Sequence, residues 1–169
     1  MSQEVEDIFR EAGAILEGHF ELTSGLHSSV YWEKFRVLSS PVHTERLCRM
    51  IAQQFEGEGI KVVAGPSLGG IIIAFEVARQ LGVRSIYAER EGEGRNFRRG
   101  YSINRGDRVL VVDDVLTTGT STRQVIDAVK RYGGEIAGVG VLVDRSLRGV
   151  TFIEGYPVFS CHQVSIPTY

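Results

Sequence analysis

Residues 111–122, VVDDVLTTGTST, combine residue types that suit the binding of a sugar phosphate. Two adjacent acids, Asp113 and Asp114, follow an apolar run, and hydroxyl side chains then surround Gly119. The hydroxyl stretch opens a predicted helix, whose free N–H groups and partial positive charge attract a phosphate. The acids would repel that phosphate, so we expect them to face vicinal sugar hydroxyls or a developing positive charge on the anomeric carbon. The stretch therefore predicts a site for a sugar phosphate with a reactive C1.

A second turn, GPSLGG at residues 65–70, also follows a short apolar run. Its glycines allow backbone N–H groups to converge on an anion. The alternative is a tight turn that needs small residues for packing alone. Beside the first phosphate site, the turn predicts a place for a pyrophosphate. No P-loop motif, G-x-x-x-x-G-K-[ST], occurs in the sequence.

The long connection at 89–106, EREGEGRNFRRGYSINRG, is rich in glycine and arginine and has no sustained apolar pattern. A connection of this length inside a compact domain is usually functional or disordered. We interpret it as a mobile lid that brings cations to an anionic ligand, with a solvated loop as the alternative. Four of its arginines could neutralise a leaving pyrophosphate: Arg90, Arg95, Arg98 and Arg99. We expect at least two of these four to be ordinary surface charges.

The apolar pattern predicts strands that alternate with helices, and hence a mostly parallel sheet covered on both faces. A first helix is expected to bury residues from Val5 to Leu16 and to end at Gly18. A hairpin or an irregular β-hood should follow around Ser24-Gly25. Ser40-Pro41 is a helix start. Strands are expected at 61–65, 84–90, 108–114, 135–145 and in the tail GYPVFSCHQV, with helices after the first and third of them. Ligands bind beyond the carboxyl ends of such strands, where GPSLGG, DDVLTTGTST and DRSLRG lie.

The totals limit the class of protein. A length of 169 residues favours one domain, and 43% hydrophobic residues are too many for a disordered chain. A net charge of −2 gives no global basic field for nucleic acid, and no apolar run approaches the roughly 20 residues of a membrane helix. The acidic, amphipathic N-terminus is unlike a signal peptide. Cys48 and Cys161 lack metal-ligand spacing, so we expect reduced thiols in a cytoplasmic protein.

Three stretches resemble one known family. VLVVDDVLTTGTS resembles the phosphoribosyl-pyrophosphate (PRPP) binding signature of type I phosphoribosyltransferases. GHFELTSGLHSSVYW is similar to the hood of orotate phosphoribosyltransferases, whose Phe-x-Leu-x-Ser-Gly-x-x-Ser pattern is matched by Phe20, Leu22, Ser24, Gly25 and Ser28. VDRSLRG, which contains Arg145, also resembles that family, and the resemblance covers nearly the whole chain.

The resemblance implies an α/β, type I phosphoribosyltransferase fold: a central, mostly parallel sheet flanked by helices, with a small N-terminal hood. It implies a single domain over 1–169, with the hood at approximately 1–40 plus the C-terminal strand and the core at approximately 41–150. The implied reaction, part of de novo pyrimidine biosynthesis, uses Mg²⁺ to convert PRPP and orotate into orotidine 5′-monophosphate and pyrophosphate. The family is typically a homodimer, in which the mobile loop, here 89–100, reaches the neighbouring site.

The resemblance also assigns site residues. Asp113, Asp114 and Arg90 are the expected catalytic residues, and the two acids also form the metal environment, indirectly through PRPP or water. The expected PRPP-binding residues are Asp113, Asp114, Val115, Leu116, Thr117, Thr118, Gly119, Thr120, Ser121, Ser67, Leu68, Gly69, Gly70, Arg90 and Arg95. The expected orotate-binding residues are Ser24, Gly25, Tyr31, Trp32, Thr117 and Arg145.

The sequence lacks several lysines and a histidine that are common in the family. The loop has no lysine or histidine, Thr23 stands where a lysine often precedes Ser-Gly, and the 65–70 turn reads Leu68-Gly69-Gly70 where a lysine is frequent. Cationic help to the pyrophosphate is therefore expected from arginine, Mg²⁺ and backbone N–H groups. We favour a short-loop branch of the family over an altered activity. Two other functions stay open: a purine-type phosphoribosyltransferase, which the hood and DRSLRG disfavour, and a non-catalytic PRPP-sensing regulator.

Overall fold

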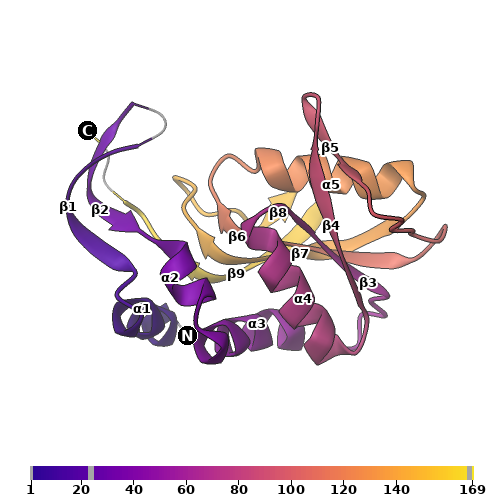
Figure 1. Cartoon of the computed structure of the whole chain (residues 1–169), viewed down its shortest axis with the longest axis horizontal. Helices are drawn as coiled ribbons and strands as arrows, with labels where there is room; N and C mark the ends of the chain where they lie inside the picture. Colours follow the sequence, from indigo (N-terminus) through magenta and orange to yellow (C-terminus); the bar gives the residue numbers. More distant parts are fainter. Residues whose placement is uncertain (1, 23–24, 167–168) are drawn as a thin grey trace.

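A seven-stranded sheet runs through the computed structural model, which describes residues 2–22, 25–166 and 169 (Figure 1). Its strand order is β5-β4-β3-β6-β7-β9-β8. The five central strands are parallel: β4 (Arg84–Glu91), β3 (Val62–Pro66), β6 (Arg108–Leu116), β7 (Glu135–Asp144) and β9 (Tyr156–Gln163). The two edge strands, β5 (Gly94–Phe97) and β8 (Phe152–Ile153), are antiparallel to their neighbours. The predicted mostly parallel sheet is confirmed.

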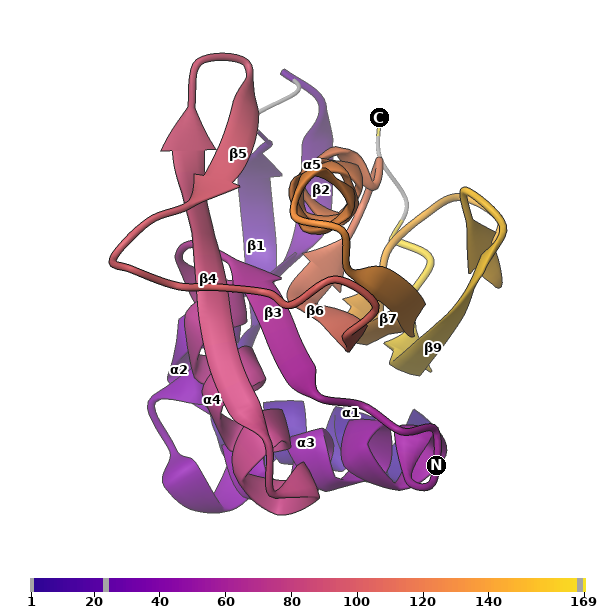
Figure 2. The ribbon, with the colours of Figure 1, turned by 90° about the vertical axis from the view of Figure 1, so that its right-hand side faces the viewer.

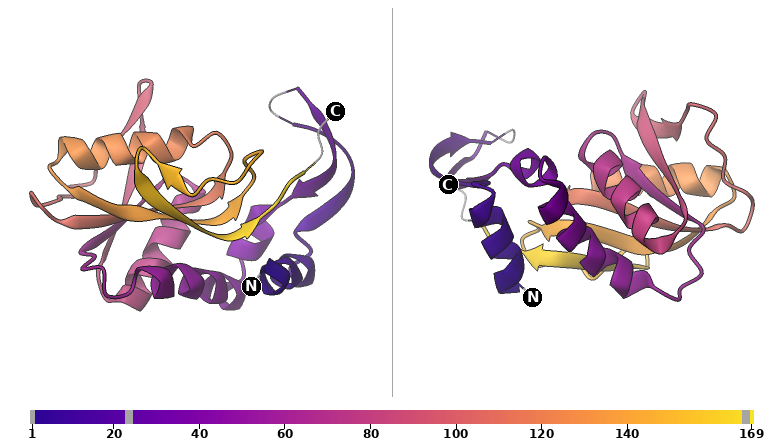
Figure 3. Two further views of the ribbon diagram at one scale, coloured as in Figure 1. Left: turned by 180° about the vertical axis from the view of Figure 1, so that it is seen from behind. Right: turned by 60° about the horizontal axis from the view of Figure 1, so that its bottom comes forward.

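Helices cover both faces of this sheet (Figures 1 and 3). Helices α3 (Pro41–Phe55) and α4 (Gly69–Leu81) pack on one face, and α5 (Thr120–Arg131) packs on the other. Because successive side chains of a strand point to opposite faces, β6 sends Leu110 and Val112 to the α3/α4 core and Val109 and Val111 to the α5 core. This alternation continues into the acids that follow.

The N-terminal segment forms the hood, in which β1 (Ile15–Glu21) and β2 (His27–Trp32) pair antiparallel between α1 (Ser2–Glu11) and α2 (Lys34–Leu38). The predicted hairpin is confirmed. The predicted end of the first helix is wrong, because α1 ends at Glu11 and Gly13 turns the chain with φ +64°. Ile15 and Leu16, which continue the helical apolar spacing, lie in β1 instead.

Aromatic contacts join the hood to the core. The Trp32 ring lies 4.7 Å from the Phe9 ring and stacks on His162 of β9 at 5.7 Å between centroids. At the chain end, backbone N–H groups of His27 and Tyr169 donate to each other's carbonyls at 2.9 and 3.1 Å. The C-terminal segment therefore contributes β9 to the main sheet and its last residue to the hood.

Part of the connection interpreted as a mobile lid forms a β-hairpin, which the sequence did not predict. β4 and β5 pair with Arg90 opposite Arg95, and the hairpin rises beyond the sheet on the same side as the hood (Figures 1 and 2). The short strand β5 lacks the apolar alternation that would predict a strand. Its structure depends instead on contacts with β4 and α5. Among the described residues, no helix has the length and apolarity required to cross a membrane.

Candidate active site

Three turns at the carboxyl ends of neighbouring strands are in direct contact. In the turn at 65–70, a Cβ atom on Gly69 would collide with the Asp114 carboxylate of β6. At the end of β7, the backbone N–H of Arg145 donates to the Leu116 carbonyl at 2.8 Å. The three sequence stretches singled out for chemistry therefore form one site.

The two acids of β6 point to opposite faces of the sheet. Asp114 continues the face of Leu110 and Val112, where its Oδ2 lies beside Gly69 and 2.7 Å from the ammonium of Lys34. Asp113 lies on the α5 face and lines a cavity of about 60 Å³ with Val115–Thr122. Both residues are nearly inaccessible, at 6% exposure for Asp113 and 4% for Asp114. The pair thus presents one carboxylate to each side of the strand end.

The environment of Asp113 opposes its ionisation. Burial, and then the charge of Asp114, raise the pKa of Asp113 well above its ordinary value. Lys34 acts in the opposite direction more weakly. The Asp113 Oδ1 accepts the backbone N–H of Asp114 at 2.8 Å, which fixes the carboxylate orientation. A cationic group placed beside Asp113 would oppose both effects and favour its ionised form.

The hydroxyl loop leads into α5 and presents three threonine side chains to solvent. Gly119 has φ +80° and precedes the first residue of α5, a conformation that glycine adopts without strain. The Thr117, Thr118 and Thr120 side chains are exposed, whereas Leu116 is buried at 2% exposure against α5. Arg123 of α5 donates to the Thr118 carbonyl at 2.6 Å. The loop can therefore offer hydroxyls and helix N-terminal N–H groups to one phosphate, with Leu116 contributing backbone only.

The glycines of the 65–70 turn have packing reasons as well as conformational ones. A Cβ on Gly65 would strike the Gly70 carbonyl, so these backbones touch, and Gly69 makes room for Asp114. The peptide bond between Ser67 and Leu68 is cis, and Leu68 is 73% exposed. Both readings of the turn, close packing and an open anion site, are compatible with this geometry.

Arg95 braces this turn from the hairpin. The residue is 4% exposed, and Nη1 donates to the Ser67 carbonyl at 3.3 Å, the Ser67 hydroxyl at 3.2 Å and the Ala88 carbonyl at 3.1 Å. Its Nε has no hydrogen-bond partner in the part of the chain that the structure describes. Arg95 therefore places a buried positive charge directly behind the predicted pyrophosphate turn.

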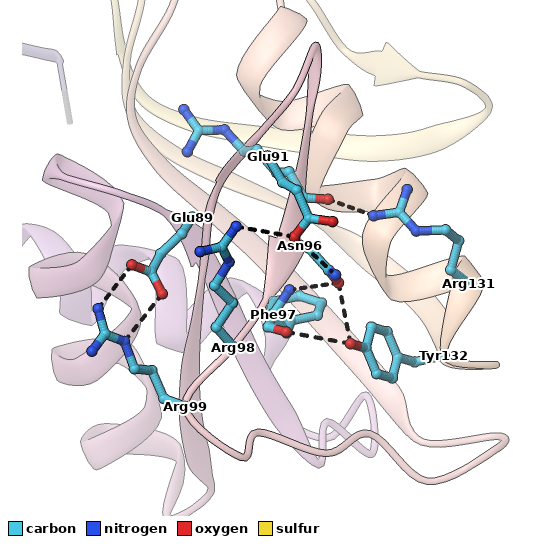
Figure 4. Close-up of polar contacts among 9 residues, drawn as sticks. Glu89, Glu91, Asn96, Phe97, Arg98, Arg99, Arg131 and Tyr132 are labelled. Atoms are coloured by element: carbon cyan, nitrogen blue, oxygen red, sulfur yellow. Dashed lines mark hydrogen bonds and ion pairs between the residues drawn. The ribbon is translucent and has the colours of Figure 1, made fainter.

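The other arginines of the hairpin divide as expected (Figure 4). Arg99 makes a two-pronged contact with Glu89 at 3.0 and 3.2 Å, and Arg98 pairs with Glu91 at 3.3 Å. These two are surface ion pairs, while Arg90 is exposed. The hairpin is attached to α5 through the Tyr132 hydroxyl, which donates to Asn96 and Phe97, and through Arg131, which donates to the Arg95 carbonyl.

On the hood side, Tyr31 is exposed and lies close enough to Arg145 to influence it electrostatically. Burial lowers the pKa of Arg145, and Tyr31 partly offsets that effect. Arg145 has no ion pair with any residue the structure describes. Trp32, the neighbour of Tyr31 in β2, points inward and is 8% exposed, so it is a packing residue. Gly25 is exposed with φ +80°, and Ser24 lies outside the described residues.

Comparison with known proteins decides between the type I families. The family model described as "Phosphoribosyl transferase domain" matches residues 40–149. Orotate phosphoribosyltransferase of Pelotomaculum thermopropionicum is 56% identical over 85% of this chain and 75% of its own length. That of Caldanaerobacter subterraneus subsp. tengcongensis is 46% identical over 99% of this chain and 87% of its own. The chain belongs to the orotate phosphoribosyltransferase family.

The solved structures agree with this assignment. The crystal structure of orotate phosphoribosyltransferase from Aeropyrum pernix superimposes with a TM-score of 0.81 at 28% identity, and the match covers 95% of this chain and 93% of that one. The predicted family and fold are therefore confirmed.

Two residues of this orotate phosphoribosyltransferase site were missed by sequence reasoning. Lys34, just after β2, reaches Asp114, and Arg123 holds the loop that precedes its own helix. Lys34 is 80 positions from its partner, and no local pattern marks it. Arg123 lies within the first turn of α5, where a cation near the phosphate loop could have been noticed.

Proposed function

We propose that this chain transfers the phosphoribosyl group from PRPP to orotate, giving orotidine 5′-monophosphate and pyrophosphate. The observation that carries the proposal is the buried pair Asp113 and Asp114, which lies between a hydroxyl-rich helix start and a glycine-rich turn. This arrangement supplies separate places for a diol, a phosphate monoester and a pyrophosphate within one site. The first of these places carries negative charge, and the other two are rich in N–H groups.

The donor lies across the carboxyl end of β6 in this proposal. The 5-phosphate is bound by the loop at 117–121, because it combines hydroxyls with the positive end of α5. Its residues are Thr117, Thr118, Gly119, Thr120 and Ser121. Asp113 and Asp114 bind the ribose hydroxyls. Residues 67–70 bind the pyrophosphate, supported by the buried charge of Arg95 and by Arg90 from the hairpin.

Orotate lies between the hood and the end of β7. Arg145 is half-buried and has a guanidinium free of ion pairs within the described part of the chain, so it suits a carboxylate. Tyr31, Gly25 and Thr117 complete the surroundings of the base. Trp32 acts here indirectly, because it holds β2 against Phe9 and His162.

The residues present fit a Mg²⁺ ion that enters with the donor. Mg²⁺ is bound by few carboxylates together with substrate phosphates and waters. Asp113 and Asp114 supply two carboxylates, and among the described residues no cluster of three metal-binding side chains forms a cage of its own. Both acids would therefore hold the ion indirectly, through the donor or water. When bound, Mg²⁺ supplies positive charge that lowers the cost of the departing pyrophosphate.

The chain's own groups favour a dissociative displacement. As the bond from C1 to the pyrophosphate oxygen breaks, its electron pair leaves with the pyrophosphate towards Arg95, Arg90 and the N–H groups of 67–70. The ribose becomes cation-like, and the carboxylates of Asp113 and Asp114 stabilise that charge. The orotate nitrogen then forms the new bond to C1 and its proton is released to solvent with the products, with no covalent enzyme intermediate. Exclusion of water by the hood and hairpin prevents hydrolysis of the donor.

The test mixes the protein with Mg²⁺, PRPP and either orotate or a purine base. The proposal expects orotate absorbance to fall and pyrophosphate to appear in equal amount. Consumption of adenine or guanine alone would show a purine-type enzyme. A PRPP-sensing regulator would bind PRPP and consume no base.

Two further assignments complete the proposal. The active form is a homodimer in which the tip of the β4–β5 hairpin, between Arg90 and Arg95, reaches the neighbouring site, which the projection of that hairpin supports (Figure 2). Sedimentation at micromolar concentration tests the dimer. The enzyme works in the cytoplasm, which the free, buried thiols of Cys48 and Cys161 support.

A further inference from the structure

The active-site carboxylate of Asp114 has a cationic partner from the hood. Lys34 is the first residue of α2, directly after β2, and its Nζ lies 2.7 Å from the Asp114 Oδ2. The carboxylate is 6% exposed, whereas the lysine side chain is 35% exposed. The ammonium therefore lies at the boundary between the buried acid and open solvent, where a ligand would enter.

The same carboxylate oxygen touches the pyrophosphate turn. Asp114 Oδ2 occupies the position that a Cβ on Gly69 would need. The turn itself, GPSLGG, contains no cation, and the chain has only three lysines, at 34, 61 and 130. Lys34 thus brings a positive charge beside a turn that has none of its own.

An ammonium group has three N–H donors, and one carboxylate oxygen does not use them all. Lysine is also a compact charge on a flexible stem, which suits contact with a pyrophosphoryl oxygen. Of the two arginines assigned to the pyrophosphate, Arg95 is buried behind the turn and already donates to Ser67 and Ala88, and Arg90 belongs to the hairpin. Lys34 is therefore the cation that approaches the turn from the hood.

We propose that Lys34 is a donor-binding residue, which orients Asp114 in the free enzyme and contacts the pyrophosphoryl group when PRPP binds. This inference rests on the assignment of residues 67–70 to pyrophosphate in the proposed function. Lys34 supplies the positive charge that the turn itself lacks, and it connects the hood to the donor site through Asp114. A purely structural lysine would hold Asp114 without touching the ligand.

The test compares Lys34→Met and Lys34→Arg with Lys61→Met, an exposed lysine at the opposite end of β3. Calorimetry with Mg²⁺ measures the affinity for PRPP, pyrophosphate and orotidine 5′-monophosphate, the last of which lacks a pyrophosphoryl group. Lys34→Met should lower the affinity for PRPP and for pyrophosphate at least about tenfold, because one charge-assisted hydrogen bond is lost. The affinity for the monophosphate should fall less than about threefold. Lys34→Arg should recover part of the loss, and Lys61→Met should match the wild type.

A double-mutant cycle separates direct contact from orientation. In an Asp114→Asn background there is no carboxylate to orient, and the buried charge that could unfold the single variant is also gone. We expect Lys34→Met to lower the affinity for pyrophosphate further in that background. No further loss, or an equal loss for PRPP and the monophosphate in the single variant, overturns it. A wild-type protein that binds neither PRPP nor the monophosphate would instead contradict the proposed function.

Discussion

Asp113 and Asp114 are adjacent in β6, yet their carboxylates lie on opposite faces of the sheet. Asp114 meets Gly69 and Lys34 on the α4 side, and Asp113 meets the hydroxyl loop on the α5 side. The alternation of a β-strand produces this division without any irregular backbone. One strand end can thereby serve two turns, to which we assign two different anions.

Asp113→Asn should raise thermal stability while it removes turnover. Burial raises the folded-state pKa of Asp113, so the native state binds its proton more tightly than the unfolded chain does. Stability therefore falls as pH rises from about 4 through that raised pKa, and the cost is fully present above it. Asparagine cannot ionise and keeps the Oδ1 acceptor for the Asp114 N–H.

Thermal melts between pH 4 and 8 measure this effect. The variant should gain Tm at pH 8, by about 2–4 °C for each kcal/mol relieved, and the gain should shrink towards pH 4. If the variant melts at or below the wild-type temperature at pH 8, then the ionised Asp113 does not destabilise the folded protein as we argue.

Gly69→Ala should damage catalysis more than folding. The added methyl group would displace the Asp114 carboxylate, and misplacement of a reacting group by about 1 Å costs on the order of 100-fold in rate. Steady-state kinetics should show a large fall in kcat. Gly138→Ala is the control, since its methyl would meet the Phe55 ring in the core and lower Tm without changing the KM for PRPP. A wild-type kcat in Gly69→Ala would show that the position of the Asp114 carboxylate does not limit catalysis.

Arg90→Ala should weaken the binding of PRPP about tenfold and leave orotate nearly unchanged, because the exposed arginine is assigned to the pyrophosphate. Separate KM values for the two substrates measure this difference. Arg84→Ala, at the other end of β4 and bonded to the Ser102 carbonyl, should behave like the wild type. Equal losses for both substrates would argue against a role of Arg90 at the pyrophosphate.

The two thiols should be unreactive in the native enzyme. Burial raises the pKa of Cys161 to about 12 and that of Cys48 further, so roughly a thousandfold less thiolate is present at pH 8 than for a free cysteine. A chromogenic disulfide reagent should titrate both thiols only after denaturation. Rapid reaction of the folded protein would contradict this prediction, because it requires opening of the core in which the Cys161 Sγ donates to the Leu47 carbonyl at 3.5 Å.

The sequence predicted those parts of the site whose residues are close together in the chain. The strand, the acid pair and the helix start of residues 108–121 form one continuous stretch, and Ser40 caps α3 through a contact three residues away. The end of α1 could not be predicted from spacing, because Ile15 and Leu16 fit a helical face and a strand equally well. The turn at Gly13 decides it.

Long-range contacts explain the rest. Strand β5 is polar and short, and it is held by Tyr132 and Arg131 of a helix that follows it by more than 20 residues. The pairing of Lys34 with Asp114 depends on how the hood sits on the sheet, which the packing of Trp32 on Phe9 and His162 fixes. No pattern within either segment contains that information.

The most direct test of the account is a crystal structure with PRPP and Mg²⁺ in the absence of orotate. The account predicts the 5-phosphate within hydrogen-bond distance of the backbone N–H groups of residues 117–121, with the pyrophosphate against residues 67–70. A donor whose 5-phosphate lies at the 67–70 turn, or away from both turns, would contradict it.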